Sequence, residues 1–383
     1  NSVVGTNEDY TYLAQLVKNS IDWLTYNPTS FVKDWPEPYS AAAIYTPTIK
    51  DNINNISSVK KTISDYGNPV TIIVEDNLAL QYPKEIASLS NSGDIVPMID
   101  LATFDSFSSE ETDLNKKEIQ KSEIVYVRDS LMKILNKPIK GITPFSGFYD
   151  KTTLDILAEE KMQFIITDSL TDRSVPKKIV LNKRDLFILT NTTRDDIVVL
   201  ENFGLNQTEF QKYTYFEDID RMIFEGGLYL LKFHNNYQLK PEYAGIFKDV
   251  TNYMKKNNVW VTSMPELLKW WDSKSGVELK YETRGKRRIS VEVSNFKESR
   301  EDEFTVEVYF NKDVKNIEIS TDLIHTPIPK FDFDKEKQKI YIYVKDLEQD
   351  EARTYLIDFE NVNEFNGNQR QVVRKLKPIE SWK

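Results

Sequence analysis

The sequence predicts an α/β domain followed by an antiparallel β-sandwich, because the spacing of its apolar residues changes once along the chain. Up to about residue 273, short apolar runs alternate with amphipathic stretches, which is typical of βα units around a parallel sheet or barrel. From residue 276 onward, apolar and polar residues alternate one by one, so each segment buries one face and exposes the other. We therefore place the domain boundary near residue 275.

The first part of the chain opens with a helix over residues 10–24 and a stiff, proline-containing connector at 34–38, so we treat residues 1–39 as a lead-in. Buried strands are expected at the short apolar runs 41–45, 70–74, 164–167, 186–189 and 228–233. Amphipathic helices are expected at 122–135, 151–161 and 242–256. Asp150 suits the N-cap of the second of these helices, and Pro241 suits the first turn of the third. Residues 40–275 then form one α/β domain.

Residues 276–383 read as a separate domain of short strands. The alternating apolar positions are Ile289, Val291 and Val293, then Phe304, Val306, Val308 and Phe310, then Ile340, Ile342 and Val344, then Tyr355, Ile357 and Phe359. Such closely spaced strands predict an Ig-like antiparallel sandwich. The basic run 284–288 is expected to be a hairpin turn with solvated charge.

The composition excludes several functional classes. The chain of 383 residues has a formal net charge of −10, so nucleic acid is not an expected partner. It has no cysteine, which removes disulfides, thiolate nucleophiles, cysteine-type zinc sites and iron–sulfur clusters. Its histidines are His234 and His325 alone, too few for a histidine cluster. No apolar run approaches the ~20 residues of a membrane span. The first residues contain neither an initiator Met nor a signal peptide, so we expect a part of a longer product.

Several segments of the first domain, taken in order, resemble one known family. They are 70–74 with 81–86 and 92–95, then Thr143-Pro144-Phe145-Ser146-Gly147-Phe148-Tyr149-Asp150 with 154–157 and 164–169, then Leu230-Leu231-Lys232-Phe233-His234 with 241–243, 258–261 and 270–271. Over residues 40–272 the chain is similar to the polysaccharide deacetylases, the NodB-homology or carbohydrate esterase 4-like family. The resemblance implies a distorted (β/α) barrel of seven or eight strands that acts on N-acetylated sugars outside the cytoplasm.

The resemblance also shows what this chain lacks. Active members carry paired aspartates on the first strand, where this sequence reads Thr46-Pro47. Active members carry two histidines four residues apart, and the matching positions here are Ile99 and Thr103. The family's general acid is matched by His234. Because hydrolytic zinc needs about three protein ligands, we expect no metal and no cofactor. An all-carboxylate site for a harder ion stays open, with Asp94, Asp100 and Asp105 near the right turn.

Candidate site residues are those at the expected strand ends, where barrel sites open. His234 and Asp168 are candidate vestigial catalytic residues, with Asp168 binding a sugar hydroxyl or positioning His234. The residues expected to bind substrate are Tyr45, Thr46, Asp100, Phe145, Asp195 and Asp196. Each also has an ordinary reading: a bonded histidine at a strand end, a turn cap, a packed aromatic ring, or a solvated turn at 192–196. If these residues have functional roles instead, we expect one concavity to be surrounded by Tyr45, Thr46, Asp100, Phe145, Asp168 and His234.

Three functions remain open from the sequence. The leading one is a deacetylase-fold domain without metal catalysis that binds a glycan or amino-sugar polymer, or that serves as a structural part of a larger protein. The second is a working de-N-acetylase or hydrolase with a rearranged carboxylate site. The third is a protein-interaction module. The resemblance alone implies a location outside the cytoplasm.

Overall fold

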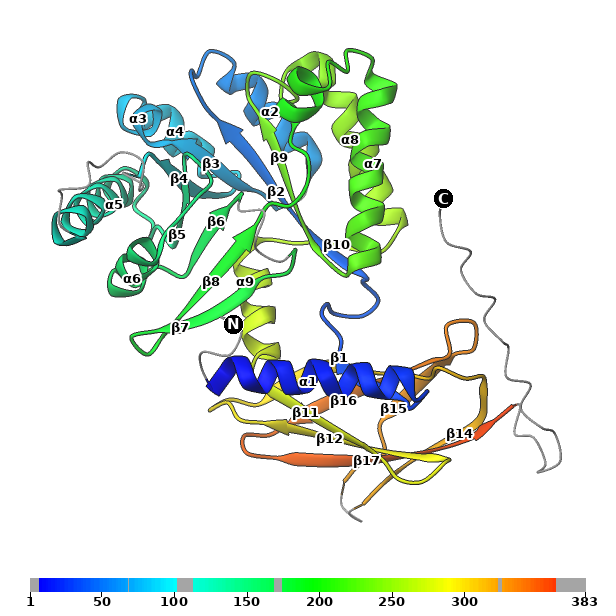
Figure 1. Ribbon diagram of the computed structural model, residues 1–383. Helices are drawn as coiled ribbons and strands as arrows, with labels where there is room; N and C mark the ends of the chain where they lie inside the picture. The colour runs from blue at the N-terminus through cyan, green and yellow to red at the C-terminus, as the bar shows by residue number, and fades with distance from the viewer. Residues whose placement is uncertain (1–6, 68, 102–112, 169–173, 323–325, 363–383) are drawn as a thin grey trace, which may run out of the picture. The chain divides into compact units, whose positions relative to one another are not determined.

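The computed structural model describes residues 7–67, 69–101, 113–168, 174–322 and 326–362 (Figure 1). The chain divides into two compact units. One contains residues 34–276, and the other combines residues 1–33 with 277–383. The segment 1–39, which the sequence suggested as a lead-in, is thus divided between the two units.

The unit of residues 34–276 is built on a curled nine-stranded sheet. Its strands are β2 (Ala41–Ile49), β3 (Thr71–Glu75), β4 (Asp94–Ile99), β5 (Gly141–Pro144), β6 (Phe164–Thr167), β7 (Lys177–Leu181), β8 (Arg184–Thr190), β9 (Leu228–His234) and β10 (Val259–Val261). They run in the order β10-β2-β3-β4-β5-β6-β8-β7, with β9 also paired to β2. Every pairing is parallel except the β7–β8 hairpin, so the carboxyl ends of the parallel strands share one edge.

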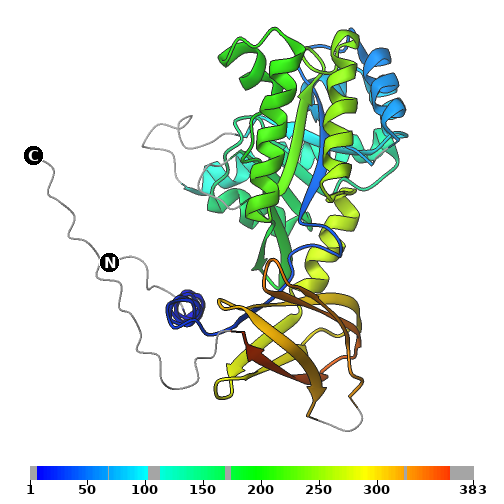
Figure 2. The ribbon, with the colours of Figure 1, turned by 90° about the vertical axis from the view of Figure 1, so that its right-hand side faces the viewer.

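Helices follow most of these strands. They are α2 (Ile56–Tyr66), α3 (Asp76–Gln81), α4 (Pro83–Leu89), α5 (Asp113–Leu135), α6 (Lys151–Glu159), α7 (Thr208–Glu225), α8 (Ala244–Lys256) and α9 (Met264–Lys274), with the short turns η2 (Val198–Asn202) and η3 (Pro241–Tyr243). Asp150 caps α6 as expected, since its carboxylate accepts from the Thr153 N–H at 2.8 Å. Pro241 opens η3 rather than α8. Helices α7 and α8 lie side by side (Figures 1 and 2), where Phe216 stacks on Tyr253 at 4.1 Å.

The sheet buries one apolar cluster on each face. The cluster on the outer face joins the sheet to helices α2 to α8 and includes Ala43 and Tyr45 of β2. The cluster on the inner face includes Ala42 and Ile44 of β2 and is closed by α9, through residues such as Trp271. Alternate residues of one strand therefore serve opposite faces, which fixes where each side chain near the strand ends can point.

The other unit contains α1 (Asn7–Leu24) and two four-stranded antiparallel sheets. One sheet has the order β1-β13-β16-β15 and the other β11-β12-β17-β14. Their strands are β1 (Thr29–Val32), β11 (Val277–Thr283), β12 (Arg288–Asn295), β13 (Glu301–Tyr309), β14 (Val314–Thr321), β15 (Lys330–Asp334), β16 (Lys339–Leu347) and β17 (Ala352–Asn361). The alternating residues Ile289, Val291 and Val293 are fully buried, as their period of two indicates. Strand β1 pairs with β13, so residues 29–32 belong to this unit rather than to the lead-in expected at 1–39.

Candidate functional site

The polar side chains of the inner face gather at the carboxyl ends of the parallel strands. On β9, Leu230 lies in the inner cluster, so Lys232 and His234 follow it on the same face. The same alternation places on this face Thr46 and Thr48 of β2, Asp100 after β4, Asp168 after β6 and Asn191 after β8. This end of the sheet is therefore the candidate site, as barrel geometry leads one to expect.

His234 is held by a carboxylate from a distant segment. Its Nδ1 lies 2.5 Å from Oδ1 of Asp196, and its backbone N–H donates to Oδ2 of Asp196 at 2.6 Å. The N–H of Gln238 also donates to Asp196, at 3.1 Å. Asp196 is completely buried. These bonds place the Nδ1 proton toward Asp196 and leave Nε2 with a lone pair, without a hydrogen-bond partner among the residues described.

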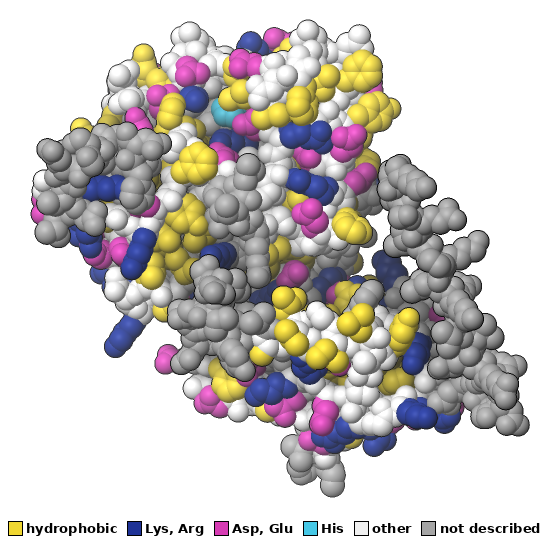
Figure 3. Space-filling model, viewed as in Figure 1, with side chains coloured by type: hydrophobic (Ala, Val, Ile, Leu, Met, Phe, Trp, Pro, Cys, Tyr) yellow, Lys and Arg dark blue, Asp and Glu magenta, His cyan; other side chains and the backbone are white. Residues whose placement is uncertain are grey.

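His234 is buried, with 4% of its surface exposed. In Figure 3 histidine atoms (cyan) are visible in a recess beside hydrophobic and charged side chains, and His234 is the histidine within the described ranges. The ring of Tyr237 lies edge-on at 6.3 Å from that of His234. The hydroxyl of Tyr237 donates to Glu201 of η2, and this bond raises the pKa of Tyr237 to about 12. A second aromatic–carboxylate pair thus borders the histidine.

The adjacent residue Asp195 has a different role from Asp196. Its Oδ1 accepts from the N–H of Val198 at 2.9 Å, so it stabilises the first turn of η2. Arg194 pairs with the buried Asp218 at 2.9 Å. The segment 192–196, expected as a solvated turn or binding loop, is therefore a turn held by hydrogen bonds and ion pairs. Its contact with the candidate site is the one between the Asp196 carboxylate and His234. Asp195 does not approach His234 in any contact of the described residues.

Asp168 pairs with lysine rather than with histidine. Its Oδ2 lies 3.0 Å from Nζ of Lys232, whose side chain is only 13% exposed. The carboxylate sits against Gly147, where a Cβ would lie 2.8 Å from Oδ2 of Asp168. Gly147 also has φ +77°, a conformation that disfavours any other residue. The ion pair balances the charge of Lys232, two residues before His234. Asp168 makes no contact with His234 among the described residues, so it does not position His234 as the sequence suggested.

The two β2 candidates lie on opposite faces. Tyr45 is fully buried in the outer cluster, where its hydroxyl bonds to Thr251 at 2.9 Å and its ring packs on Phe247. Burial raises the pKa of Tyr45 to about 12. This burial in the outer cluster contradicts the expectation that Tyr45 contacts a substrate. Thr46 does face inward, and its buried Oγ1 has no hydrogen-bond partner in the described part of the chain.

Aromatic and acidic side chains border the same end of the sheet. Phe145 is 42% exposed, and Nζ of Lys50 lies 4.3 Å from the centre of its ring. Asp100 is exposed at the end of β4. Burial raises the pKa of Asp76, and the negative charges of Glu75 and Asp100 raise it further. The side chains of Glu75, Asp76 and Asp100 therefore form one group of electrostatically interacting carboxylates.

The donor set does not fit the catalytic metal that this fold carries in active enzymes. Thr46 and Pro47 offer no carboxylate, and Ile99 is a buried apolar residue of the outer cluster. Thr103 lies outside the described residues. Among the residues described there is no group of three or more His, Cys, Asp or Glu side chains that could hold a metal. No chemical step is therefore assigned to a metal here.

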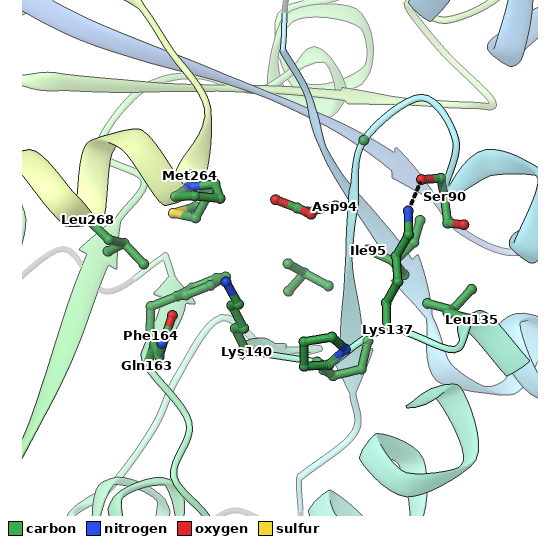
Figure 4. Close-up of a pocket in the computed structure, with 15 residues that line it drawn as sticks. Ser90, Asp94, Ile95, Leu135, Lys137, Lys140, Gln163, Phe164, Met264 and Leu268 are labelled. Atoms are coloured by element: carbon green, nitrogen blue, oxygen red, sulfur yellow. Dashed lines mark hydrogen bonds between the residues drawn. The ribbon is translucent and has the colours of Figure 1, made fainter. Parts of the chain in front are cut away.

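A separate cavity of about 190 Å³ lies at the amino ends of β4, β5 and β6, against α9 (Figure 4). Its walls are mainly apolar, with Phe164, Met264 and Leu268 among them. Figure 4 shows Lys137 directed at Ser90, whose carbonyl oxygen accepts from the ammonium at 2.8 Å. The lining includes Asp94, at the amino end of β4, but none of the expected catalytic or substrate-binding residues, so this cavity is distinct from the candidate site. Asp94 therefore lies at the opposite end of β4 from Asp100, which does not fit a shared all-carboxylate ion site, and Asp105 lies outside the described residues.

Solved structures share the architecture of the larger unit. A protein assigned as a polysaccharide deacetylase from Mycobacterium smegmatis matches 64% of this chain and 94% of its own, with a TM-score of 0.52 at 14% identity. Puue allantoinase matches 63% of this chain and 94% of its own, with a TM-score of 0.52 at 13% identity. A protein assigned as a polysaccharide deacetylase from Pseudomonas aeruginosa PAO1 matches 64% and 94%, with a TM-score of 0.50 at 13% identity. No family model and no curated protein matches the chain.

At these identities the comparisons establish the fold, which is the NodB-type fold of polysaccharide deacetylases. The residues at Thr46, Pro47 and Ile99 make the family's metal motifs degenerate in this chain. None of the described helices combines the length and the hydrophobicity that crossing a lipid bilayer requires.

Sequence reasoning did not find the contacts that define the site. Asp196 was a candidate for substrate binding, but its position against His234 depends on a contact 38 residues away along the chain. Lys232 was not a candidate, although a lysine inside an apolar strand, two residues before His234, is a visible signal. Nothing in the sequence around Glu201 and Tyr237 marks them as residues of the site.

Proposed function

We propose that the unit of residues 34–276 binds a glycan at the carboxyl ends of its strands, without metal-dependent deacetylation. The observation that carries this proposal is the buried Asp196–His234 pair, which is retained at a site whose metal-ligand positions hold Thr46, Pro47 and Ile99. An oriented imidazole with a free Nε2 can accept a hydrogen bond from a sugar hydroxyl or donate one when protonated.

The charge and aromatic content favour an amino sugar. Glu75, Asp76 and Asp100 supply negative charge that attracts a glucosamine-type cation. The exposed rings of Phe145 and Phe148 offer flat apolar faces for a sugar ring. Asp168 contributes less to this attraction than its position suggests, because Lys232 already balances its charge.

The architecture of the second unit and the location are part of the same proposal. We infer that the two antiparallel sheets pack as an Ig-like sandwich, since Phe310 after β13 meets Phe359 of β17 with ring centres 4.9 Å apart. A sandwich in the same chain as a glycan-binding barrel suits a protein that works outside the cytoplasm on carbohydrate polymers and has further domains as partners.

The test compares chitosan tetramer with its fully N-acetylated form in titrations of the full chain followed by calorimetry. We expect saturable binding of the amino form, weaker binding of the acetylated form, and no acetate release from either. His234→Gln should weaken binding, and Lys330→Gln, on β15 of the other unit, is a matched control. Failure of both tetramers to bind at millimolar concentration would leave the interaction-module function as the better account.

A second candidate function is hydrolysis by the histidine itself. The Asp196–His234 pair has the geometry of a general base held by a carboxylate, with Nε2 as the acting atom. The assay for acetate release tests this second function. Release of acetate from the N-acetylated tetramer that is lost in His234→Gln and insensitive to chelators would favour hydrolysis by the histidine.

A further inference from the structure

A cavity of about 330 Å³ opens in the unit that contains residues 277–383. Four separate segments form it: the residues after α1, the β11–β12 turn, the β13–β14 turn and the end of β17. Its lining residues are Tyr26, Asn27, Pro28, Thr283, Gly285, Lys286, Phe310, Asn311, Lys312, Val314, Phe359 and Asn361. None of these is acidic, although the chain has 60 Asp and Glu residues and a net charge of −10. The cavity is therefore a locally positive site on an acidic protein.

Both lysines of this cavity hold unbalanced charge. Neither Lys286 nor Lys312 forms an ion pair with a residue that the structure describes. A wider hollow of about 540 Å³ shares Lys286 and is bordered by Arg284, Arg287, Arg288 and Asp358. In that hollow Asp358 is engaged by Arg288 through bonds of 2.7 and 2.8 Å, so it does not neutralise Lys286. Arg284 in turn lies 3.8 Å from Glu282, so the unbalanced charge that this hollow shares with the cavity is that of Lys286.

Tyr26 gives the cavity an aromatic rim. Its side chain is 59% exposed, and Nζ of Lys312 lies 5.6 Å from the centre of its ring. Its backbone has φ +58°, a left-handed conformation that is unfavourable for tyrosine and that tends to persist at binding sites. The amide of Asn311 donates to the carbonyl of Asn27 at 3.2 Å and holds this loop in place.

We propose that this cavity binds an anionic saccharide. Lysine ammonium groups pair with a carboxylate or phosphate, asparagine amides bond to hydroxyl groups, and an exposed tyrosine ring packs on the flat face of a sugar. The three kinds of group occur together here, in Lys286 and Lys312, in Asn27, Asn311 and Asn361, and in Tyr26. The site lies in a different unit from the barrel, so it does not depend on the function proposed there.

The experiment titrates the full chain with trigalacturonate and with maltotriose, a neutral trisaccharide of equal length, and uses glucose 6-phosphate and inorganic phosphate as further probes. We expect trigalacturonate to bind, maltotriose not to bind, and the affinity to fall as salt is added. Stronger binding of glucose 6-phosphate than of trigalacturonate would assign the anion as a phosphate rather than a carboxylate, within the same proposal.

Variants locate the site. The double variant Lys286→Gln, Lys312→Gln should bind about a hundredfold more weakly, since the loss of each charged hydrogen bond lowers the affinity about tenfold. Tyr26→Asn removes the ring with a residue that accepts left-handed backbone, and should also weaken binding. Lys330→Gln, an exposed lysine outside the cavity, should leave binding unchanged. Unchanged affinity in both cavity variants, equal binding of maltotriose, or equal binding of inorganic phosphate and the sugars would overturn the proposal.

Discussion

Nδ1 of His234 lies 2.5 Å from Oδ1 of Asp196, and the two residues are 38 positions apart in the chain. His234 ends β9, whereas Asp196 follows β8 and precedes η2. The same carboxylate also accepts the backbone N–H groups of His234 and Gln238. One buried side chain therefore fixes both the orientation of the imidazole and the path of the chain beyond β9.

Removing the Asp196 carboxylate should destabilise the fold as well as the site. Asp196→Ala leaves three buried donors without an acceptor, so we expect a loss of roughly 3 kcal/mol in the free energy of unfolding. The adjacent control Asp195→Ala removes only a cap bond and should cost about 1 kcal/mol. Urea denaturation of both variants measures the difference. Equal losses would show that the buried contacts of Asp196 carry no special weight.

Freeing Asp168 should raise the affinity for a cationic sugar. In Lys232→Met the carboxylate of Asp168 loses its counter-ion at 3.0 Å. Because Asp168 is more than a third exposed, stability should change by less than about 1 kcal/mol. Titration should show tighter binding of chitosan tetramer and no change for the N-acetylated tetramer. Parallel changes for both sugars would mean that Lys232 acts through packing rather than charge.

Gly147 should not tolerate a side chain. A Cβ there would lie 2.7 Å from Cβ of Asp168, in addition to the strain of φ +77°. Gly147→Ala should therefore cost about 2–3 kcal/mol and shift the NMR signals of Asp168. Gly67→Ala is the matched control, since Gly67 has φ +60° but nothing within 4 Å of its Cβ. The control should lose about 1 kcal/mol. Similar losses in the two variants would mean that the Asp168 contact is relieved by a small shift.

The Asp150–Lys116 pair should make stability depend on pH. Although burial works against it, hydrogen bonds from Lys116 and Thr153 hold the pKa of Asp150 below its ordinary value. The stabilisation is present above the unfolded pKa of about 3.9 and is lost as the pH falls through the folded pKa. Asp150→Asn keeps a good N-cap but removes the charge, and should cost roughly 2–3 kcal/mol at neutral pH.

The check is denaturation of wild type and Asp150→Asn at several pH values. The difference between them should shrink toward acid conditions. Glu159→Gln, which removes a surface carboxylate paired with Lys117 and Lys121, should show a much smaller difference throughout. A difference for Asp150→Asn that does not vary with pH would contradict the role given to its charge.

The sequence predicted five of the nine strands described in the larger unit, and three of its helices, because their signals are local. The apolar run 164–167 matches β6, the run 228–233 matches β9 to within one residue, and the Asp150 cap was recognised from its spacing. Strand β1 was missed because four residues at a sheet edge carry too little pattern. Helix α7 and η2 were missed inside the segment 170–225, where charged and apolar residues are mixed.

The site was harder to predict for two physical reasons. All nine residues of β2 are buried, so the sequence does not reveal which of the two adjacent residues, Tyr45 or Thr46, faces the site. The partner of His234 is set by a long-range contact, and the turn at Asp195 and η2 decides which of two adjacent carboxylates reaches it. The expected strand ends were enough to predict where the site lies. The direction of each side chain could be determined only from the folded structure.

The most direct test of the central claim is calorimetric titration of chitosan tetramer into the full chain, with and without chelator, alongside an acetate assay on the N-acetylated tetramer with added zinc. Our account predicts saturable binding that chelator and zinc leave unchanged, because it relies on His234, Asp196 and the nearby carboxylates rather than on a metal. It predicts no acetate release. Zinc-dependent release of acetate, or binding abolished by chelator, would contradict it.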